Sequence, residues 1–293
     1  MNLSTIGWTD YSGGDLNFVT GCTPISAGCA HCYARRIYGR FGRDFSQVQT
    51  HPEKLARLER AHPGIPVKDR AGNVSYVSHK RSGCKPMCFV CDTGDLFHDD
   101  VSDGFIYHVL DTLAERSDVV WQILTKRAKR MRDLVTGWVG QAIVLKELPS
   151  HIWLGITTEN QQAANERVPL LLQTPATVRF VSVEPMLEWM SLDRWLQPDY
   201  EGMGREAEWE PIDSSDPRRN ALDWVICGAE SGPDRRPFDV TWAVDLYEQC
   251  ADASVPFFAK QDSGLKPGAP LDLPGYSVVR EWPGDKYNGP LPF

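Results

Sequence analysis

The sequence predicts an α/β fold, a partial (β/α) barrel of about six to seven parallel strands. Six runs of apolar or β-branched residues recur along the chain, and their starts are separated by 32, 33, 26, 46 and 31 residues. About 30 residues is the length of one strand with its crossover helix, and helical periodicity fills several of the intervals. Near-continuous apolar strands that alternate with helices are typical of a parallel sheet covered on both faces. The expected strands are residues 87–92, 119–124, 152–156, 178–183, 224–227 and 255–259, and the clearest helices are residues 105–114, 161–172 and 240–250.

The rest of the chain is predicted to add one more strand and two insertions. Residues 16–20 form a short strand-like run, and a helix is expected to begin at Tyr33. Residues 44–83 are polar, irregular and punctuated by Pro and Gly, which indicates an insertion or a lid. Residues 195–221, rich in Glu, Pro, Asp and Gly, are interpreted as a surface insertion. We therefore expect one partial-barrel domain over residues 1–293.

The composition is that of a soluble globular protein, with 42% hydrophobic and 24% charged residues. The net charge of −8 argues against a broad non-specific nucleic-acid coat, although a local basic groove is compatible with it. No apolar run approaches the roughly 20 residues that span a bilayer. The first residues lack the pattern of a signal peptide, so we expect a cytoplasmic protein with no membrane partner. Eight cysteines in such a protein indicate metal or redox chemistry before disulfides.

Three cysteines in one loop are the main functional signal. Six residues separate Cys22 from Cys29, and two separate Cys29 from Cys32. Gly and Pro make this segment a loop, so its thiolates can surround one centre. Three thiolates suit an iron–sulfur cluster with one open iron, or a zinc ion with a fourth ligand, for which His31 is the nearby candidate. Ordinary buried or disulfide-bonded cysteines are the structural alternative.

A second group of cysteines is a rival metal motif. Cys84, Cys88 and Cys91 are separated by three and two residues. Because residues 87–92 are an expected strand, Cys88 and Cys91 should point to opposite faces, with roughly 10 Å between their Cα atoms. We therefore favour Cys91 alone as a thiol that lines the site. Cys227 and Cys250 are interpreted as small core residues.

Each expected strand ends in polar residues. In a parallel barrel these ends share the C-terminal rim, where active sites lie, and the cysteine loop reaches the same rim. Carboxylates there could hold ribose hydroxyls or an amino group, and a glycine turn could let backbone approach a cofactor. Helix capping and structural ion pairs with Lys126, Arg127 or Lys260 are the alternatives. The catalytic candidates are Asp95, His98, Lys126 and Lys260, and the cofactor-binding candidates are Thr157, Glu159, Ser182, Glu184, Gly228 and Glu230.

Arginines and lysines near the rim form a candidate phosphate-binding stripe. Its members are Arg35, Arg36, Arg127, Lys129 and Arg130, although for the last two we favour solvation of the surface.

These motifs resemble a phage- and prophage-associated family of largely uncharacterised proteins that a three-cysteine motif defines. The resemblance covers nearly the whole chain except residues 44–83 and 195–221. Phe18 stands where the family usually has proline. The matching residues are Trp8-Thr9-Asp10, Asn17, Val19 to Cys22, Cys29, Cys32-Tyr33-Ala34, Asp95 to His98, Leu124 to Arg127, Ser182 to Pro185, Gly228 to Gly232 and Lys260-Gln261.

That family is similar to radical S-adenosylmethionine enzymes. The resemblance implies a [4Fe–4S] cluster on Cys22, Cys29 and Cys32, with S-adenosylmethionine on its fourth iron. It also implies cleavage of S-adenosylmethionine to a 5′-deoxyadenosyl radical that abstracts hydrogen from a substrate. A nucleobase, a nucleotide or modified phage DNA is the candidate substrate, and a flavodoxin or ferredoxin the candidate reductant. Six residues lie between the first two cysteines, rather than the three usual in such enzymes. A non-catalytic iron–sulfur or zinc-stabilised module that binds nucleic acid or protein is the alternative function.

Overall fold

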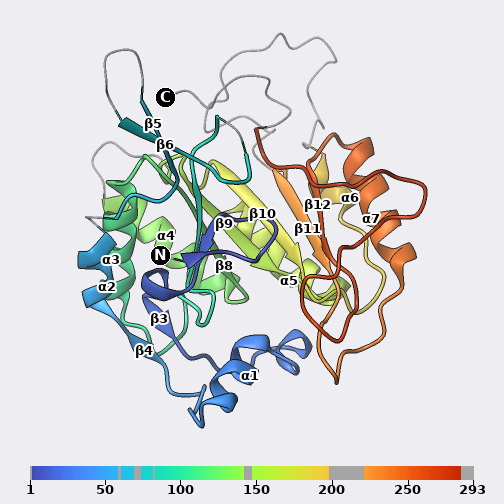
Figure 1. Ribbon diagram of the computed structural model, residues 1–293, viewed down its shortest axis with the longest axis horizontal. Coiled ribbons are helices and arrows are strands. Elements are labelled where there is room, and N and C mark those ends of the chain that lie inside the picture. Colours follow the sequence, from blue (N-terminus) through green and yellow to red (C-terminus); the bar gives the residue numbers. More distant parts are fainter. Residues whose placement is uncertain are drawn as a thin grey trace.

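A curled sheet of eight strands is the centre of the computed structural model, which describes residues 2–58, 61–68, 74–81, 83–141, 147–197 and 221–284 (Figure 1). The strand order is β1-β2-β7-β8-β9-β10-β11-β12, and every neighbouring pair from β2 onward is parallel. The strands are β1 (Asn2–Leu3), β2 (Tyr11–Ser12), β7 (Met87–Val90), β8 (Val120–Thr125), β9 (Ile152–Thr157), β10 (Val178–Val183), β11 (Trp224–Gly228) and β12 (Phe257–Gln261).

The predicted fold class is confirmed by this sheet. All six expected apolar runs are strands of it, and β2 adds a seventh parallel strand beside β7. β1 is the one antiparallel strand, at the edge.

A strand does form within residues 16–20, but it does not belong to the main sheet as predicted. β3 (Val19–Thr20) pairs with β4 (Gln49–Thr50) in a separate two-stranded sheet, and β2 takes the expected position next to β7. The physical cause is a break directly after β2, where Gly13 and Gly14 have φ of +70° and +56°. Glycine adopts this left-handed backbone without steric cost, so the chain turns away from the sheet there.

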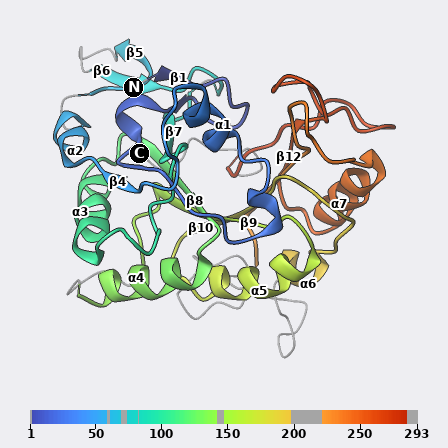
Figure 2. The ribbon, with the colours of Figure 1, turned by 90° about the horizontal axis from the view of Figure 1, so that it is seen from below.

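The helices lie along the outer face of the curled sheet (Figure 2). The predicted helices are confirmed, and each of the three has a side-chain cap at its first turn. Ser102 accepts from Phe105 N at 3.3 Å, and Asn160 from Ala163 N at 2.9 Å. These caps satisfy backbone donors that a helix leaves free. The outer helices are α3 (Asp103–Ala114), α4 (Ala128–Gln141), α5 (Gln161–Leu172), α6 (Asp193–Leu196) and α7 (Val240–Asp252). None of the helices in the described residues is long and apolar enough to cross a membrane.

Alternation along each strand divides the buried side chains between two cores. In β11, Val225 and Cys227 face the outer core beneath the helices, while Trp224 and Ile226 face inward. The sequence predicted a sheet covered on both faces. The inner face is covered by aromatic side chains rather than by helices, because the sheet is curled around them. The inner cluster consists of Trp8, Met87, Phe89, Val120, Trp153, Phe180, Trp224, Ile226 and Phe258.

The Trp8-Thr9-Asp10 motif attaches the N-terminal segment to the barrel. The Trp8 ring lies among the inner aromatic residues, with its centroid 4.8 Å from that of Phe89. The buried Asp10 carboxylate accepts from Met87 N at 2.9 Å and from the Ser78 hydroxyl at 2.9 Å. This part of the family motif therefore has a structural role.

The predicted insertion at residues 44–83 is more ordered than expected. It contains β4, α2 (Pro52–Leu58) and a hairpin of β5 (Ile65–Lys68) and β6 (Val74–Val77). Leu55 and Leu58 are buried in the outer core, so α2 belongs to the fold. These are only two large apolar residues, three positions apart, in a polar segment that contains Pro52 and Pro63, which is why no periodicity revealed them. The other insertion lies outside the described residues from 198 to 220, and the single-domain arrangement stays a prediction.

Replacement of Gly155 by Ala is expected to destabilise the protein by about 1–3 kcal/mol, since it overpacks the inner core. Gly155 pairs with Phe180 across β9 and β10, and a Cβ there would lie 2.4 Å from the Phe180 ring. Urea denaturation measures the change. The matched control is Gly140→Ala in α4, where a Cβ meets nothing within 4 Å and helix propensity adds about 0.5–1 kcal/mol. Equal stability of the two variants would contradict the packing.

Candidate functional site

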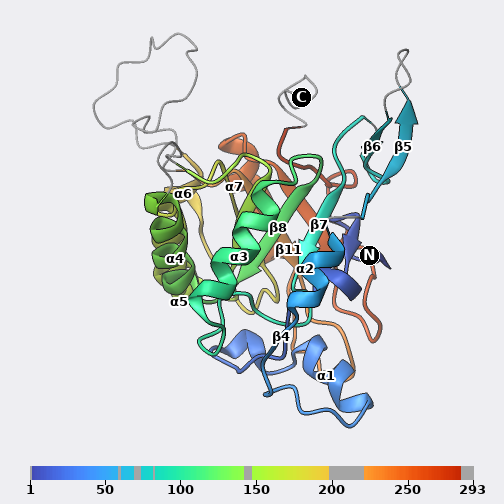
Figure 3. The ribbon, with the colours of Figure 1, turned by 90° about the vertical axis from the view of Figure 1, so that its left-hand side faces the viewer.

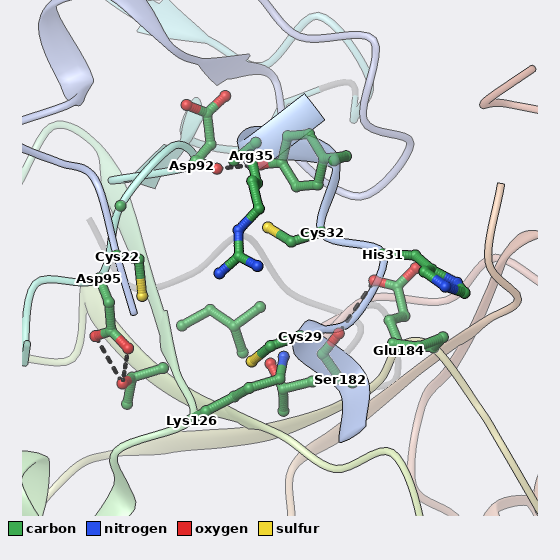
Figure 4. Close-up of a pocket in the computed structure, with 18 of the residues that line it drawn as sticks. Cys22, Cys29, His31, Cys32, Arg35, Asp92, Asp95, Lys126, Ser182 and Glu184 are labelled. Carbon is green, nitrogen blue, oxygen red and sulfur yellow. Dashed lines mark hydrogen bonds between the residues drawn. The ribbon is translucent and has the colours of Figure 1, made fainter. Parts of the chain in front are cut away.

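The three loop cysteines line one cavity of about 260 Å³. The cavity lies at the C-terminal ends of the strands, on the side where α1 (Tyr33–Arg40) projects from the sheet (Figure 3). Figure 4 shows Cys22, Cys29 and Cys32 on different sides of the same space, with Arg35 and Lys126 extending into it. Other lining residues are Trp8, Ile25, Phe89, Asp92, Asp95, Leu124, Thr157, Ser182, Glu184, Glu230 and Lys260.

One end of the loop is held by a buried ion pair at the ends of β7 and β8. Arg127 Nη1 lies 2.9 Å from Asp95 Oδ2 and 3.5 Å from the Cys22 sulfur. Arg127 also donates to Thr23 O at 3.3 Å, and the Thr125 hydroxyl donates to both Asp95 oxygens at 2.8 and 2.9 Å. Asp95, predicted as catalytic, therefore positions Arg127, and Arg127 holds the start of the loop.

The other end of the loop is held at the end of β11. Glu230 accepts from the Arg236 guanidinium and from Arg236 N at 2.8 Å, and His31 Nδ1 lies 3.1 Å from Glu230. Arg236 also donates to Ala27 O at 3.0 Å. Burial by itself raises the pKa of Glu230, but the bonds from Arg236 and His31 outweigh it and lower that pKa to about 2. Glu230 is therefore an ionised anchor of the loop.

Gly232 lets a second arginine reach the same strand end. Its φ is +116°, and a Cβ there would lie 1.8 Å from Arg36 Nη1. Arg36 passes over this glycine and donates to Ser231 O at 2.8 Å. Glycine is required here both for its backbone conformation and for the space.

The thiols of the loop have unlike surroundings. Burial and the Asp95 charge raise the pKa of Cys22, against the opposite effect of Arg127. Burial also acts to raise the pKa of Cys29, but hydrogen bonding with the backbone of Ile25 and the Lys126 charge make the net shift downward. Lys126, a predicted site residue, makes no hydrogen bond or ion pair among the described residues, so its charge is available to the cavity.

A third ion pair lines the wall opposite Cys22. Lys260 Nζ lies 2.8 and 3.0 Å from the two Glu184 oxygens, and the Ser182 hydroxyl donates to Glu184 at 3.0 Å. Gly228 does not line the cavity; a Cβ on it would lie 2.6 Å from a Glu184 oxygen, so its role is to leave room for that carboxylate. Thr157 lines the cavity and is buried.

Two other predicted residues lie behind the lining. His98 Nε2 lies 2.7 Å from the Thr23 hydroxyl, and its Nδ1 accepts from Asp100 N at 3.1 Å. Burial and the Arg127 charge lower the pKa of His98, so it is a neutral support for the loop. Glu159 pairs with Arg167 at 2.9 Å beneath Gly28. All three predicted glutamates thus form ion pairs, but only Glu184 pairs with a cation that the sequence analysis named, Lys260.

Cys91 lines the cavity, as favoured from the sequence, but it does not diverge from Cys88 as predicted. Cys88 and Cys91 both lie in the outer core rather than on opposite faces. The cause is the left-handed conformation of Cys91, φ +59°, which ends the alternation of β7. Burial raises the pKa of Cys88 well above its usual value and that of Cys91 to about 12, which favours protonated thiols over metal ligands. Cys227 and Cys250 are buried core residues, as predicted.

The loop thiols fit an iron–sulfur cluster. Within the described residues, no three His, Cys, Asp or Glu side chains are arranged to hold a single metal ion. A [4Fe–4S] cluster binds each thiolate through a different iron, so its ligands surround a volume instead of converging on one point. Cys22, Cys29 and Cys32 surround the cavity in this way (Figure 4).

Sequence reasoning missed Arg236, which no motif marked, and the part that Arg127 plays in holding the loop. The sequence did indicate Arg127 as one of the polar residues that follow β8. His31, considered as a zinc ligand, contacts Glu230 instead.

A family model described as "Protein of unknown function (DUF5131)" matches residues 3–288. The chain belongs to this family. No curated protein matches the sequence. A solved structure similar to this DUF5131 chain is spore photoproduct lyase complexed with dinucleoside spore photoproduct, at 11% identity and a TM-score of 0.48, over 90% of this chain and 78% of that chain. A mutant of the same lyase matches at 10% identity and a TM-score of 0.48, over 91% and 78% of the two chains. Since these TM-scores lie below 0.5, the function proposed below is supported by the residues of the DUF5131 chain itself.

Replacement of Glu230 by Gln is expected to lower the free energy of unfolding at pH 7 by about 1.5–3 kcal/mol, since it weakens charge-assisted bonds to Arg236 and His31. The folded pKa of Glu230 is lowered from 4.5 to about 2, so its stabilising effect is complete above pH 4.5 and is lost as the pH falls through about 2. Urea denaturation at pH 7 and at pH 3 checks this. The variant and the parent should differ less at pH 3, whereas the exposed control Glu115→Gln should match the parent at both values. A constant difference would show that Glu230 is not the ionised anchor.

Proposed function

We propose that this protein is a radical S-adenosylmethionine enzyme that abstracts hydrogen from a nucleobase or nucleotide unit. The observation that supports it is the cysteine loop: three thiols surround one cavity at the C-terminal rim of a curled parallel sheet, and ion pairs from two strand ends hold that loop. Cys22, Cys29 and Cys32 would hold a [4Fe–4S] cluster. When bound, the reduced cluster supplies the electron that cleaves S-adenosylmethionine and so starts radical chemistry.

The chain supplies binding groups suited to S-adenosylmethionine on the wall opposite Cys22. The carboxylate of Glu184, which pairs with Lys260, can accept bonds from an ammonium group, and the Ser182 hydroxyl orients it. Thr157 offers a hydroxyl on the same wall. The extended Lys126 carries an unpaired cation that can bind a carboxylate. Ile25, Phe89 and Leu124 contribute apolar side chains to the cavity lining.

The proposed function needs a one-electron reductant, for which a flavodoxin or a ferredoxin has the right chemistry. It also needs a reducing compartment such as the cytoplasm. The described cysteines form no disulfide with one another, which is compatible with that setting.

The direct test is made on protein purified without oxygen. Iron, sulfide and zinc are counted first, and the EPR spectrum of the reduced protein is then recorded with and without S-adenosylmethionine. A [4Fe–4S] signal that changes with S-adenosylmethionine, together with formation of 5′-deoxyadenosine, supports the proposal. Zinc, or a cluster whose spectrum ignores S-adenosylmethionine, favours the non-catalytic binding module instead.

Replacement of Cys29 by Ala is expected to abolish the cluster, since a [4Fe–4S] centre with one open iron needs all three thiolates. Iron content and the absorbance of the reconstituted protein measure this. Cys84→Ala is the control, because Cys84 belongs to the rival cysteine group and does not line the cavity. Loss of iron in Cys84→Ala with retention in Cys29→Ala would reverse the assignment of ligands.

Substitutions of Arg127 and Asp95 are expected to move the cluster potential in opposite directions. The Arg127 charge beside the Cys22 sulfur favours the more negative, reduced state, so Arg127→Gln lowers the potential. Asp95→Asn removes the opposing charge and raises it. An EPR-monitored redox titration gives both values.

The matched controls are Arg130→Gln and Asp103→Asn, an Arg–Asp pair of similar geometry at 2.7 Å whose members do not line the cavity. Both should leave the potential unchanged. Shifts of the same sign in Arg127→Gln and Asp95→Asn would indicate a general loosening of the loop rather than an electrostatic effect.

A further inference from the structure

The cavity opens beside a strongly basic segment in an otherwise acidic protein. We define the arginine lip as α1 and the three residues after it, Tyr33–Arg40 with residues 41–43. Between Asp15 and Asp44 the sequence contains no acidic residue, whereas the lip carries four arginines. The whole chain has a net charge of −8, so this positive charge is concentrated locally. A concentration of this kind attracts anionic partners.

Three of these arginines have no partner. The side chains of Arg35, Arg40 and Arg43 make no hydrogen bond, ion pair or ring contact within the part of the chain that the structure describes. Every other described arginine does: it meets a carboxylate, a hydroxyl, a backbone carbonyl or an aromatic ring, as Arg36 meets Ser231 O. Asp44, the carboxylate next to Arg43 in the sequence, is engaged in its own loop, where it accepts from Ser46. The lip therefore presents unused guanidinium groups.

Large apolar side chains lie between these arginines on the surface. Phe41 is 72% exposed, Tyr33 is 43% exposed and Ile37 is 37% exposed. Ala34 is the buried residue of α1, so the helix contributes little to the core. Exposed rings interspersed with arginines are typical of surfaces that bind single-stranded nucleic acid, because bases stack on the rings while phosphates bind the cations.

The lip leads into the cavity. Arg35 lines the cavity and extends between the cysteines, as Figure 4 shows. Arg40 lies five residues further along α1, about 7.5 Å along the axis at the rise of a helix. Arg43 follows in the next turn. A strand whose phosphates bind Arg40 and Arg43 would therefore lie beside the mouth of the cavity, close to the helix turn that carries Arg35.

We propose that the arginine lip binds the phosphates of a single-stranded polynucleotide and presents one of its nucleotides to the cavity. Presentation for reaction rests on the proposed function, but binding to the lip does not. An acidic protein would also complement the positive charge of the lip. A strand is favoured because its single units can enter a cavity of about 260 Å³ while their neighbours remain on the lip.

The test is the affinity for fluorescein-labelled twelve-nucleotide oligothymidylate, measured by fluorescence anisotropy from 50 to 300 mM salt. The variant is Arg40→Ala/Arg43→Ala. Removal of two phosphate contacts should reduce the slope of log affinity against log salt by about 1.4, at roughly 0.7 for each contact with a single strand. Oligouridylate and a duplex of the same length are measured in parallel. Equal binding of the two single strands would show that the lip recognises phosphates and bases. Tighter binding of the duplex would overturn the proposal.

The control Arg57→Ala/Arg132→Ala changes the net charge by the same amount at two arginines paired elsewhere, with Asp15 and Asp133. It should bind like the parent. Equal weakening of both double variants would overturn the proposal, since only net charge would then matter. Unchanged oligonucleotide binding in the lip variant, with loss of binding to an acidic flavodoxin, would assign the lip to a protein partner. Iron content and the EPR response to S-adenosylmethionine are recorded on the same samples, so failure of the proposed function is seen separately.

Discussion

The position of the cysteine loop depends on charged groups at two strand ends. The loop has no core of its own: none of residues 22–32 is buried. Asp95 holds it through Arg127 at the end of β7, and Glu230 holds it through Arg236 and His31 at the end of β11. These strands lie on opposite sides of the curled sheet, with β8, β9 and β10 between them. Because the loop is anchored at two strand ends on opposite sides of the curled sheet, Cys22 is held on a different side of the cavity from Cys29 and Cys32.

Buried ion pairs of this kind specify geometry more than they add stability. Taking two charges out of water costs several kcal/mol for each ion, which their attraction offsets only when further bonds satisfy them. Asp95 meets this requirement through Thr125, and Glu184 through Ser182. Glu230 does so through Arg236 N. An unpaired carboxylate would be too costly to bury at these positions. Each strand end therefore fixes the position of a carboxylate and of the cation that pairs with it.

The sequence was sufficient for the elements that depend on local pattern. β8 to β12 are near-continuous apolar runs of five or six residues, and these predict buried parallel strands regardless of their neighbours. β2 has two residues and one paired position, so no periodicity can reveal it. α2 was hidden by the prolines around it, although Leu55 is buried in the outer core.

The candidate site was predictable in its location but not in its pairings. Parallel topology brings strand ends to one rim, so Ser182, Glu184 and Lys126 could be named from their positions after apolar runs. Which cation meets which carboxylate depends on loops that sequence pattern does not describe. Glu230 thus pairs with Arg236, six residues on in a loop. His98 follows the same strand as Asp95 but turns behind Thr23, because its ring nitrogens are both engaged there.

The distribution of partners divides the cations around the cavity into two groups. Arg127, Arg236 and Lys260 each hold a carboxylate, so their charges are already neutralised within the fold. Lys126 and Arg35 extend into the cavity with no such partner. A protein of net charge −8 has carboxylates available for these groups, yet the segment from residue 16 to residue 43 contains none. Unpaired cations therefore lie both in the cavity, at Lys126 and Arg35, and on the lip, at Arg40 and Arg43. The same side of the molecule therefore has a positively charged wall for a small anionic group and a positively charged approach for a larger one.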